Sequence, residues 1–392
     1  MGENKISCVL NDSTKNISES LLEFAGLKIA KKVIKFHQSL PDYKPTPLVN
    51  LSHFANKLGI KQLTIKDESH RFNLNAFKVL GASYAIAQHL SDFLNLKDDE
   101  LEFDKIICHK NRYKDITLAT ATDGNHGRAV AFCAKLFGCK AVVYMPKGSS
   151  KTRLKAIQSY GAVATITTLN YDDTVIYAKE QAQKNGQILL QDTAWDGYQK
   201  VPSDIMQGYF TLITEDIKYH QNNWPTHVFL QAGVGSLAAS IVAYMTSFKD
   251  KATPKFIVVE PNGAKCFFES MQQQKPLKIS GELPTIMAGL ACGKPSNLAW
   301  QILKSTADAF LSCNDDITCH GMRALANPIK TDKKVISGES GAVTMGTLSQ
   351  ILTNKKYQNI KNDLELDHDS KVLLFSTEGD TDPENYCHII CS

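Results

Sequence analysis

Residues 116–145 of this 392-residue chain have the sequence ITLATATDGNHGRAVAFCAKLFGCKAVVYM. The apolar run 116–121 predicts a strand, residues 127–137 predict an amphipathic helix, and residues 141–145 predict a second strand. A strand, a helix and a strand of these lengths form a βαβ unit, in which the strands are parallel and the crossover is right-handed. The stretch therefore predicts an α/β protein.

The same alternation extends in both directions along the chain. Before this stretch, a strand is expected at 63–66 and a helix at 76–89. After it, helices are expected at 151–160, 172–184 and around 203–219, and strands at 162–167, 188–191, 226–231, 256–260 and 372–376. Repeated units of this kind predict two lobes, each with a mostly parallel twisted sheet flanked by helices. We expect a large domain of residues 1–80 and 205–392 and a smaller inserted domain of residues 81–204.

The composition argues against several classes of protein. Hydrophobic residues make up 43% of the chain and charged residues 21%, as in ordinary globular proteins. The net charge of +4 comes from scattered basic residues, so no nucleic-acid partner is expected. No apolar run approaches the ~20 residues of a membrane-spanning helix, and residues 1–16 lack the apolar core of a secretory signal. The ten cysteines include no CxxC pair, so we expect no metal site, and reduced thiols in a cytoplasmic protein.

The first segment that carries chemistry is residues 73–82, NLNAFKVLGA. Lys78 stands there at the start of a mostly apolar helix, which is an unusual position for a solvated charge. A lysine that is desolvated has a lowered pKa, and its free amine becomes a nucleophile suited to Schiff-base chemistry. A lysine that extends to solvent from a helix end is the more common arrangement, so other segments have to decide between the two.

Two turns between a strand and a helix have the composition of ligand-binding loops. In residues 231–236, QAGVGS, the glycines let the backbone approach an anion and the following helix offers N–H groups. The loop lacks a Walker lysine and a third glycine, which favours a single phosphate, with a plain tight turn as the alternative. In residues 120–127, TATDGNHG, the Asn125 amide can bond a ligand, and Asp123 and His126 are titratable. A helix-capping Asx turn is the alternative there.

Residues 337–341, SGESG, and 376–382, STEGDTD, are weaker signals singly, because their acidic side chains also suit solvated turns. In sequence order, however, the lysine, the asparagine loop, the glycine loop and the final serine–threonine turn resemble the fold-type II pyridoxal-phosphate enzymes, the tryptophan synthase β-like superfamily. Within it, the chain is similar to the diaminopropionate ammonia-lyases from about Pro45 to Asp382. The motifs that carry this resemblance are NLNAFKVLGASYAIAQ, ATATDGNHGR, YMPKGSS, NYDDTV, QDTAW, MQGY, QAGVGS, MAGLACG, ISGESGAV and STEGDTD.

The resemblance implies a cofactor and its contacts. Lys78 would carry pyridoxal 5′-phosphate as a Schiff base, and Asn125 would contact the 3′-oxygen of the cofactor. Thr377, or Ser376 beside it, would face the pyridine nitrogen, where a neutral hydroxyl suits elimination better than chemistry that needs a protonated ring. The large domain would then be the cofactor-binding domain. The residues expected to hold the phosphate are Gly233, Val234, Gly235 and Ser236.

Two aspartates narrow the expected reaction. Asp123 stands where many members of the superfamily have a small residue, and Asp192 belongs to the motif QDTAW. We expect Asp123 to remove Cα–H from a D-substrate and Lys78 to act from the opposite face on the L-isomer. Asp192 would recognise the distal amine of the substrate or assist proton transfer there. The implied activity is that of a carbon–nitrogen lyase converting D- and/or L-2,3-diaminopropionate to pyruvate and two ammonia.

Two alternatives remain at this point. A threonine/serine dehydratase-like or β-replacing enzyme of the same fold is one, and a cofactor-binding pseudoenzyme is the other. Asp123 and Asp192 argue against the first alternative, and the retained Lys78 together with both aspartates argues against the second. Family habit implies a homodimer that acts on a small-molecule amino acid. The sequence leaves open the preference between D and L isomers, the pathway, any monovalent cation and whether Cys266 and Cys292 pair.

Overall fold

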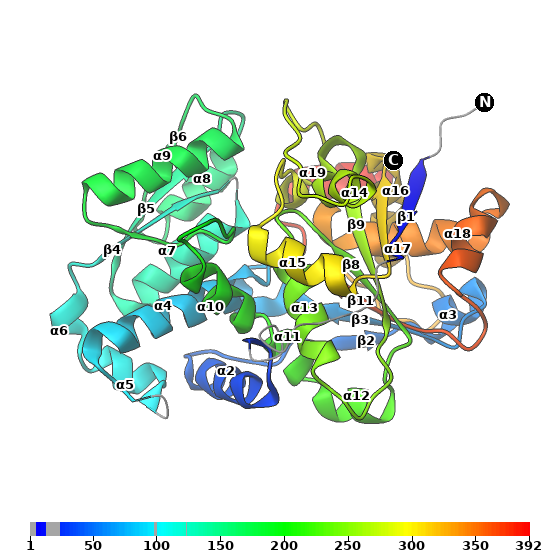
Figure 1. The fold of residues 1–392 in the computed structure, drawn as a ribbon, viewed down its shortest axis with the longest axis horizontal. Helices are drawn as coiled ribbons and strands as arrows, with labels where there is room; N and C mark the ends of the chain where they lie inside the picture. Colours follow the sequence, from blue (N-terminus) through cyan, green and yellow to red (C-terminus); the bar gives the residue numbers. More distant parts are fainter. Residues whose placement is uncertain (1–4, 13–23, 98–99, 123) are drawn as a thin grey trace. The chain divides into compact units, whose positions relative to one another are not determined.

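The computed structural model describes residues 5–12, 24–97, 100–122 and 124–392, which form two compact units (Figure 1). The larger unit contains Pro45–Ala76, Glu215–Ser392 and the described part of Met1–Ala25. The smaller unit contains Gly26–Lys44 and Phe77–Thr214. Within the described ranges, no helix has the length and apolar character needed to cross a bilayer.

The larger unit is built around a seven-stranded sheet with the strand order β1-β10-β9-β8-β11-β3-β2. Its strands are β1 (Ile6–Leu10), β2 (Leu48–Asn50), β3 (Gln62–Asp67), β8 (His227–Gln231), β9 (Lys255–Pro261), β10 (Ala309–Cys313) and β11 (Lys371–Ser376). The five inner strands are mutually parallel, and the edge strands β1 and β2 are antiparallel to their neighbours. Strand β11, the last in sequence, lies inside the sheet between β8 and β3.

Helices cover both faces of this sheet, and β8 and β10 are accordingly buried along their whole length. The chain crosses the sheet from β8 through β9 to β10 and then returns from β10 to β11. Because parallel crossovers are right-handed, the helices of the two passes lie on opposite faces. The first pass contains α13 (Ser236–Thr246), α14 (Cys266–Gln272) and α15 (Asn297–Thr306), and the second contains α16 (Asp315–Ala326) and α17 (Glu339–Thr353). The unit also contains α3 (Ser52–Leu58), η1 (Glu68–Asn73), α12 (Ile217–Asn222), η3 (Asn262–Ala264), η4 (Ala288–Leu290), η5 (Lys355–Tyr357), α18 (Gln358–Asp363) and α19 (Pro383–Cys391).

The smaller unit contains a four-stranded parallel sheet with the order β6-β5-β4-β7. Its strands are β4 (Thr117–Ala121), β5 (Lys140–Met145), β6 (Val163–Ile166) and β7 (Ile188–Leu189). The chain moves from β4 to β6 and then returns to β7, so α9 lies on the face opposite α7 and α8 (Figure 1). The helices of this unit are α2 (Leu27–Ser39), α4 (Lys78–Leu94), α5 (Phe103–Ile107), α6 (Lys110–Tyr113), α7 (Asn125–Phe137), α8 (Lys151–Gln158), α9 (Tyr171–Lys184), α10 (Lys200–Gly208) and α11 (Thr211–Thr214).

These sheets confirm the predicted α/β class with two mostly parallel sheets. The single helix predicted around 203–219 is wrong, because the segment forms the three short helices α10, α11 and α12. The interruption before α12 has a physical cause. Glu215 and Asp216 both accept hydrogen bonds from the buried ammonium of Lys66, at 2.7 and 2.6 Å, and this fixes the backbone there outside a continuous helix.

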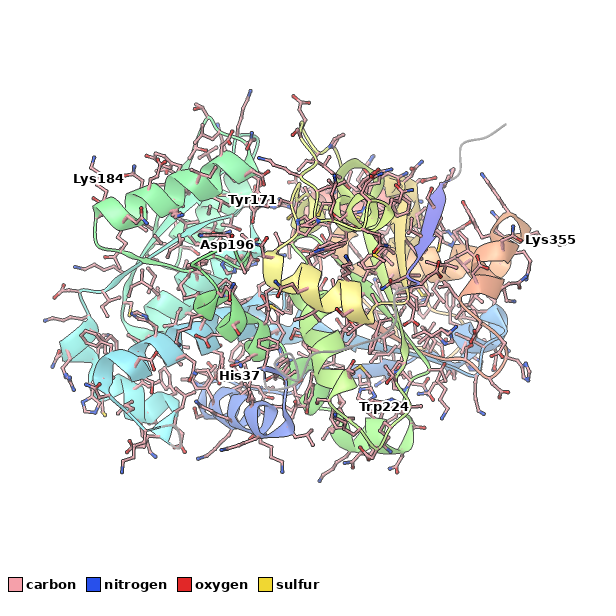
Figure 2. The ribbon with its side chains drawn as sticks, viewed as in Figure 1. His37, Tyr171, Lys184, Asp196, Trp224 and Lys355 are labelled. Atoms are coloured by element: carbon pink, nitrogen blue, oxygen red, sulfur yellow. The ribbon has the colours of Figure 1, made fainter. Side chains whose placement is uncertain are left out.

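The observed division of the chain differs from the predicted domain limits chiefly at residues 26–44, which belong to the smaller unit. Helix α2 packs there against α4, α10 and α11. Its His37, labelled in Figure 2, is completely buried, with Nδ1 2.6 Å from Thr211 Oγ1 and Nε2 donating to Leu80 O at 3.0 Å. These contacts connect a segment that is remote in sequence, which is why alternation of strands and helices could not assign it.

Candidate active site

Lys78 is the first residue of α4, a helix in which most residues are buried. The lysine side chain is 20% exposed, and its Nζ donates a hydrogen bond to Asp192 Oδ2 at 2.6 Å. The amine that the sequence predicts to be a nucleophile is therefore mostly withdrawn from solvent and held by a carboxylate.

Asp192 follows strand β7 and supplies the counter-charge of that lysine; its side chain is 5% exposed. Burial alone would raise the pKa of this carboxyl, but the Lys78 ammonium and its hydrogen bond outweigh burial and lower the pKa to about 2. The charge of Asp192 also acts on the buried phenols of Tyr198 and Tyr209, whose pKa values are raised mainly by burial. Asp192 is thus ionised at neutral pH in a nearly dry site.

The asparagine loop connects β4 to α7, and the half-buried Asn125 is the first residue of that helix. The side chain of Gln191 ties this loop to the end of β7, because its Oε1 accepts from Ala121 N at 3.0 Å and from Thr120 Oγ1 at 3.2 Å. The carboxyl ends of these two parallel strands are where ligands collect in open α/β sheets. Asp123, the predicted base, lies outside the described residues.

His126 links the asparagine loop to Asp192 within the smaller unit. Its ring is 3% exposed, and Nε2 lies 2.8 Å from Leu190 O while Nδ1 lies 4.0 Å from Asp192 Oδ2. The following Gly127 permits this packing, because a Cβ there would come 2.8 Å from Val143 Cγ1. The structure therefore brings together Lys78 and Asp192, both candidate catalytic residues from the sequence, and His126, which the sequence marks only as titratable.

In the larger unit, the glycine loop 231–236 leads from β8 into α13. Gly235 has φ +88°, and a Cβ on it would come 2.3 Å from Phe267 Cζ, so only glycine fits without displacing the aromatic ring. Helix α13 has no side-chain cap and no acidic residue in its first turn. The buried Val234 and Ser236 flank Gly235. The loop thus leads into a helix N-terminus that has no side-chain cap, where free N–H groups and the positive end of the helix dipole favour an anion.

Gly233, also in this loop, is surrounded closely. A Cβ there would come 3.0 Å from Gly289 O and 3.1 Å from Cys292 Sγ, and Cys266 Sγ donates to Gly233 O at 3.8 Å. The two sulfur atoms therefore flank the same glycine, although 26 positions separate these cysteines in the sequence.

The serine–threonine turn at the end of β11 adjoins the end of β8 in the same unit. Gln231 Nε2 donates to Phe375 O at 2.9 Å and to Thr377 Oγ1 at 2.8 Å. Ser376 Oγ donates to the backbone oxygen of Glu378 at 3.4 Å. Since Thr377 Oγ1 accepts from Gln231, its own proton is left to point at a further acceptor, and we regard Thr377 as the better candidate for a ring nitrogen.

Sequence reasoning missed two residues that organise this part of the larger unit. Gln231 stands at the start of the glycine loop, and a polar residue directly after the apolar run 228–230 is a usable signal. Glu378 accepts from Ser340 N at 3.0 Å, which makes the two weak turns, 337–341 and 376–382, direct neighbours. No local pattern in either turn predicts that contact.

The comparisons with known proteins agree on one family. A family model described as pyridoxal-phosphate dependent enzyme matches residues 40–373. The diaminopropionate ammonia-lyases of Salmonella typhimurium and Escherichia coli are 47% and 45% identical, over 92% of this chain and 92% and 91% of theirs. A crystal structure of the Escherichia coli enzyme in complex with an aminoacrylate-PLP azomethine reaction intermediate has a TM-score of 0.90 and 42% identity, covering 98% of this chain and 97% of that one. The chain therefore belongs to the pyridoxal-phosphate-dependent enzymes and, within them, to the diaminopropionate ammonia-lyases.

Proposed function

We propose that this protein eliminates ammonia from D- and/or L-2,3-diaminopropionate to give pyruvate and a second ammonia, with pyridoxal 5′-phosphate as cofactor. The observation that carries the proposal is the ion pair between the largely withdrawn Lys78 and the buried Asp192, with Nζ 2.6 Å from Oδ2. It combines an amine suited to Schiff-base chemistry with a carboxylate suited to a substrate that has two amino groups. When bound, pyridoxal phosphate withdraws electrons from the substrate Cα and so makes its proton removable.

The residues of each unit fit this cofactor. The uncapped N-terminus of α13, with the Cβ-free position at Gly235, suits a phosphate group, and Gly233, Val234 and Ser236 complete that loop. Thr377, held by Gln231, is the proposed partner of the pyridine nitrogen, with Ser376 as the less suitable neighbour. In the smaller unit, Lys78 would form the covalent bond and Asn125 would contact the 3′-oxygen.

Asp192 distinguishes this proposal from the dehydratase-like alternative. A diamino acid brings a second ammonium into a dry site, and that charge is stable only beside an anion. Asp192 is ionised, 5% exposed and already bound to one ammonium, so it matches this requirement. Serine and threonine carry a hydroxyl at that position and gain nothing comparable from a carboxylate.

The test compares substrates and variants in one assay of ammonia and pyruvate. D- and L-2,3-diaminopropionate, serine and threonine are supplied in parallel to the wild type, Lys78→Ala, Asp192→Asn and Asp196→Asn. Asp196, labelled in Figure 2, is an exposed aspartate in the same segment and serves as the matched control. We expect Asp192→Asn to lose about 10²–10⁴-fold in kcat/KM for diaminopropionate and Asp196→Asn to keep its activity. A clear preference of the wild type for serine or threonine would overturn the proposal.

The roles of the two bases have a separate test. Asp123→Asn should lose activity on the D-isomer by about 10²–10⁴-fold while activity on the L-isomer largely survives, because Lys78 serves the opposite face. Equal loss on both isomers would refute this assignment.

Cofactor attachment and assembly are tested independently of turnover. Borohydride reduction should fix the cofactor on Lys78, detectable by peptide mass spectrometry, and the absence of that adduct would favour a pseudoenzyme. We also propose a cytoplasmic homodimer, by analogy with the family, and sedimentation at equilibrium would reveal a monomer if this is wrong.

A further inference from the structure

The two nitrogens of the buried His126 ring differ in their hydrogen bonding. Nε2 lies 2.8 Å from Leu190 O, and because a carbonyl oxygen only accepts hydrogen bonds, Nε2 carries a proton. In the neutral ring, Nδ1 is then a bare lone pair. Within the described ranges of the chain, this buried Nδ1 has no hydrogen-bond partner, and it faces the carboxylate of Asp192 at 4.0 Å.

Two acceptors that face each other away from water form an unfavourable arrangement unless a positive charge is close by. In this structure Lys78 provides it, because its ammonium lies 2.6 Å from Asp192 Oδ2. The same ammonium contributes to keeping the imidazole neutral. Burial is the main cause that lowers the pKa of His126, Asp192 opposes it, and the charge of Lys78 lowers the pKa further.

We infer that His126 replaces Lys78 as the counter-charge of Asp192 whenever the lysine amine is engaged by the cofactor. Condensation of the Lys78 ammonium with the cofactor aldehyde would form a C=N bond and release one water and one proton, and His126 Nδ1 would gain that proton. The resulting imidazolium keeps Asp192 ionised and oriented in readiness for the second ammonium of the substrate. His126 is thus a positioning residue that acts through Asp192, and the inference rests on the proposed role of Lys78.

The groups that face this pair come from each element packed around it. Lys78 comes from α4, Asp192 follows β7, and the phenols of Tyr198 and Tyr209 respond to the charge of Asp192. From α8, Arg153 lies against Gly124, with its Cδ 3.4 Å from where a Cβ would stand. Lys78 and His126 are bases that lie next to Asp192 in the described part of the chain, so removing the charge of one leaves the other able to compensate Asp192.

The test is a pH titration of the imidazole groups by NMR on the full-length, histidine-labelled protein. Three samples are compared: the wild type without cofactor, the wild type loaded with pyridoxal phosphate, and Lys78→Met without cofactor. We expect the pKa of His126 to be higher by about one unit or more in the second and third samples, which corresponds to a tenfold change in proton affinity. In the double variant Lys78→Met/Asp192→Asn, the pKa of His126 should return to a low value. The His126→Gln variant identifies the NMR signal of His126.

His227 is the matched control, because it is also buried and its Nε2 donates to a carbonyl, Leu364 O, at 2.9 Å. It belongs to the larger unit, and its titration should be the same in all samples. An unshifted His126 in Lys78→Met, or a shift that survives Asp192→Asn, would overturn the inference. If Lys78→Met does not fold, the cofactor-loaded wild type gives the same comparison.

The two hypotheses can fail separately, since the NMR readout requires no turnover. An enzyme that degrades diaminopropionate but shows no change at His126 would refute the inference alone. A protein that shows the change but releases no ammonia from diaminopropionate would refute the proposed function alone.

Discussion

Arg71 and Glu215 form an almost completely buried ion pair, with Nη1 of the arginine 2.7 Å from Oε1 of the glutamate. Glu68 binds the same guanidinium and Lys66 the same carboxylate, so four buried charges compensate one another within the larger unit. Glu215 is the residue at which the chain re-enters this unit, and Arg71 lies shortly before the point at which it leaves. The cluster therefore holds two chain passages together by charge.

Replacing Glu215 by Gln should destabilise the protein strongly, because Arg71 and Lys66 would lose a buried counter-charge. We expect a loss of about 3–5 kcal/mol in the free energy of unfolding, measured with urea at neutral pH. The control is Asp369→Asn, which removes the exposed pair with Lys61 and should cost at most about 1 kcal/mol.

The stabilisation by Glu215 also depends on pH. Burial alone would raise the pKa of Glu215, but Arg71 and Lys66 lower it to about 2. The stabilisation is therefore present above pH ~4.5 and lost as the pH falls towards 2. Equal losses in the two variants would contradict this account.

Glu260 gives the opposite pH dependence. It is fully buried at the end of β9 and accepts from Phe267 N and Phe268 N at the start of α14. Burial raises its pKa from 4.5 to about 8. A raised pKa in the folded state means that the stability contributed by this group is complete below pH 4.5 and is lost as the pH rises through about 8.

Glu260→Gln should therefore flatten the pH dependence of the unfolding free energy between pH 5 and 8, compared at several pH values in urea. Glu269→Gln is the control, because Glu269 lies on α14 and is partly exposed, and this variant should keep the slope of the wild type. A slope that is unchanged in Glu260→Gln would show that this carboxyl is ionised in the folded protein.

Gly235→Ala should weaken binding of the cofactor. The added Cβ meets the ring of Phe267 and the backbone has φ +88°, so the glycine loop 231–236 has to shift. The backbone conformation alone costs about 1–3 kcal/mol for a non-glycine residue. Gly148→Ala has a similar φ of +91° and nothing within 4 Å, so it isolates that cost. Titration with pyridoxal phosphate should show a raised Kd for Gly235→Ala only, and an equal Kd in both variants would exclude a role for the loop.

Thr377→Val should impair the reactivity of the bound cofactor more than Ser376→Ala does. The Thr377 hydroxyl accepts from Gln231 and has its proton available, whereas Ser376 donates to the backbone of Glu378. We expect a lower kcat and a shifted absorption maximum of the bound cofactor in Thr377→Val, with little change in Ser376→Ala. The reverse order would assign the ring nitrogen to Ser376.

Much of the fold was predictable because the strands of parallel sheets are short apolar runs that end at turns. Strands β3, β8, β9 and β11 have this pattern, and so does the βαβ unit at 116–145. Edge strand β1 was missed because its residues are only partly buried and pair with β10, some 300 positions away. Pairing over such a separation leaves no local signal.

The candidate site was predictable where chemistry depends on a motif and not where it depends on packing. Lys78 and the glycine loop stand in motifs with an unusual composition. The contact of His126 with Asp192 depends on which ends of β4 and β7 adjoin, and the Arg71–Glu215 pair depends on the path of the chain between units. Both are tertiary facts with no periodicity in sequence.

The position of β11 has a consequence for biosynthesis. A ribosome finishes the smaller unit, at Thr214, about 160 residues before it finishes β11, a delay of roughly 10–30 s at ordinary elongation rates. From the completion of β8 until β11 is made, the nascent larger sheet has a gap between β8 and β3, with two unpaired strand edges of the kind that aggregate. Premature termination before β11 would leave the smaller unit, with Lys78 and Asp192, attached to a split sheet, which is a substrate for chaperones and proteases.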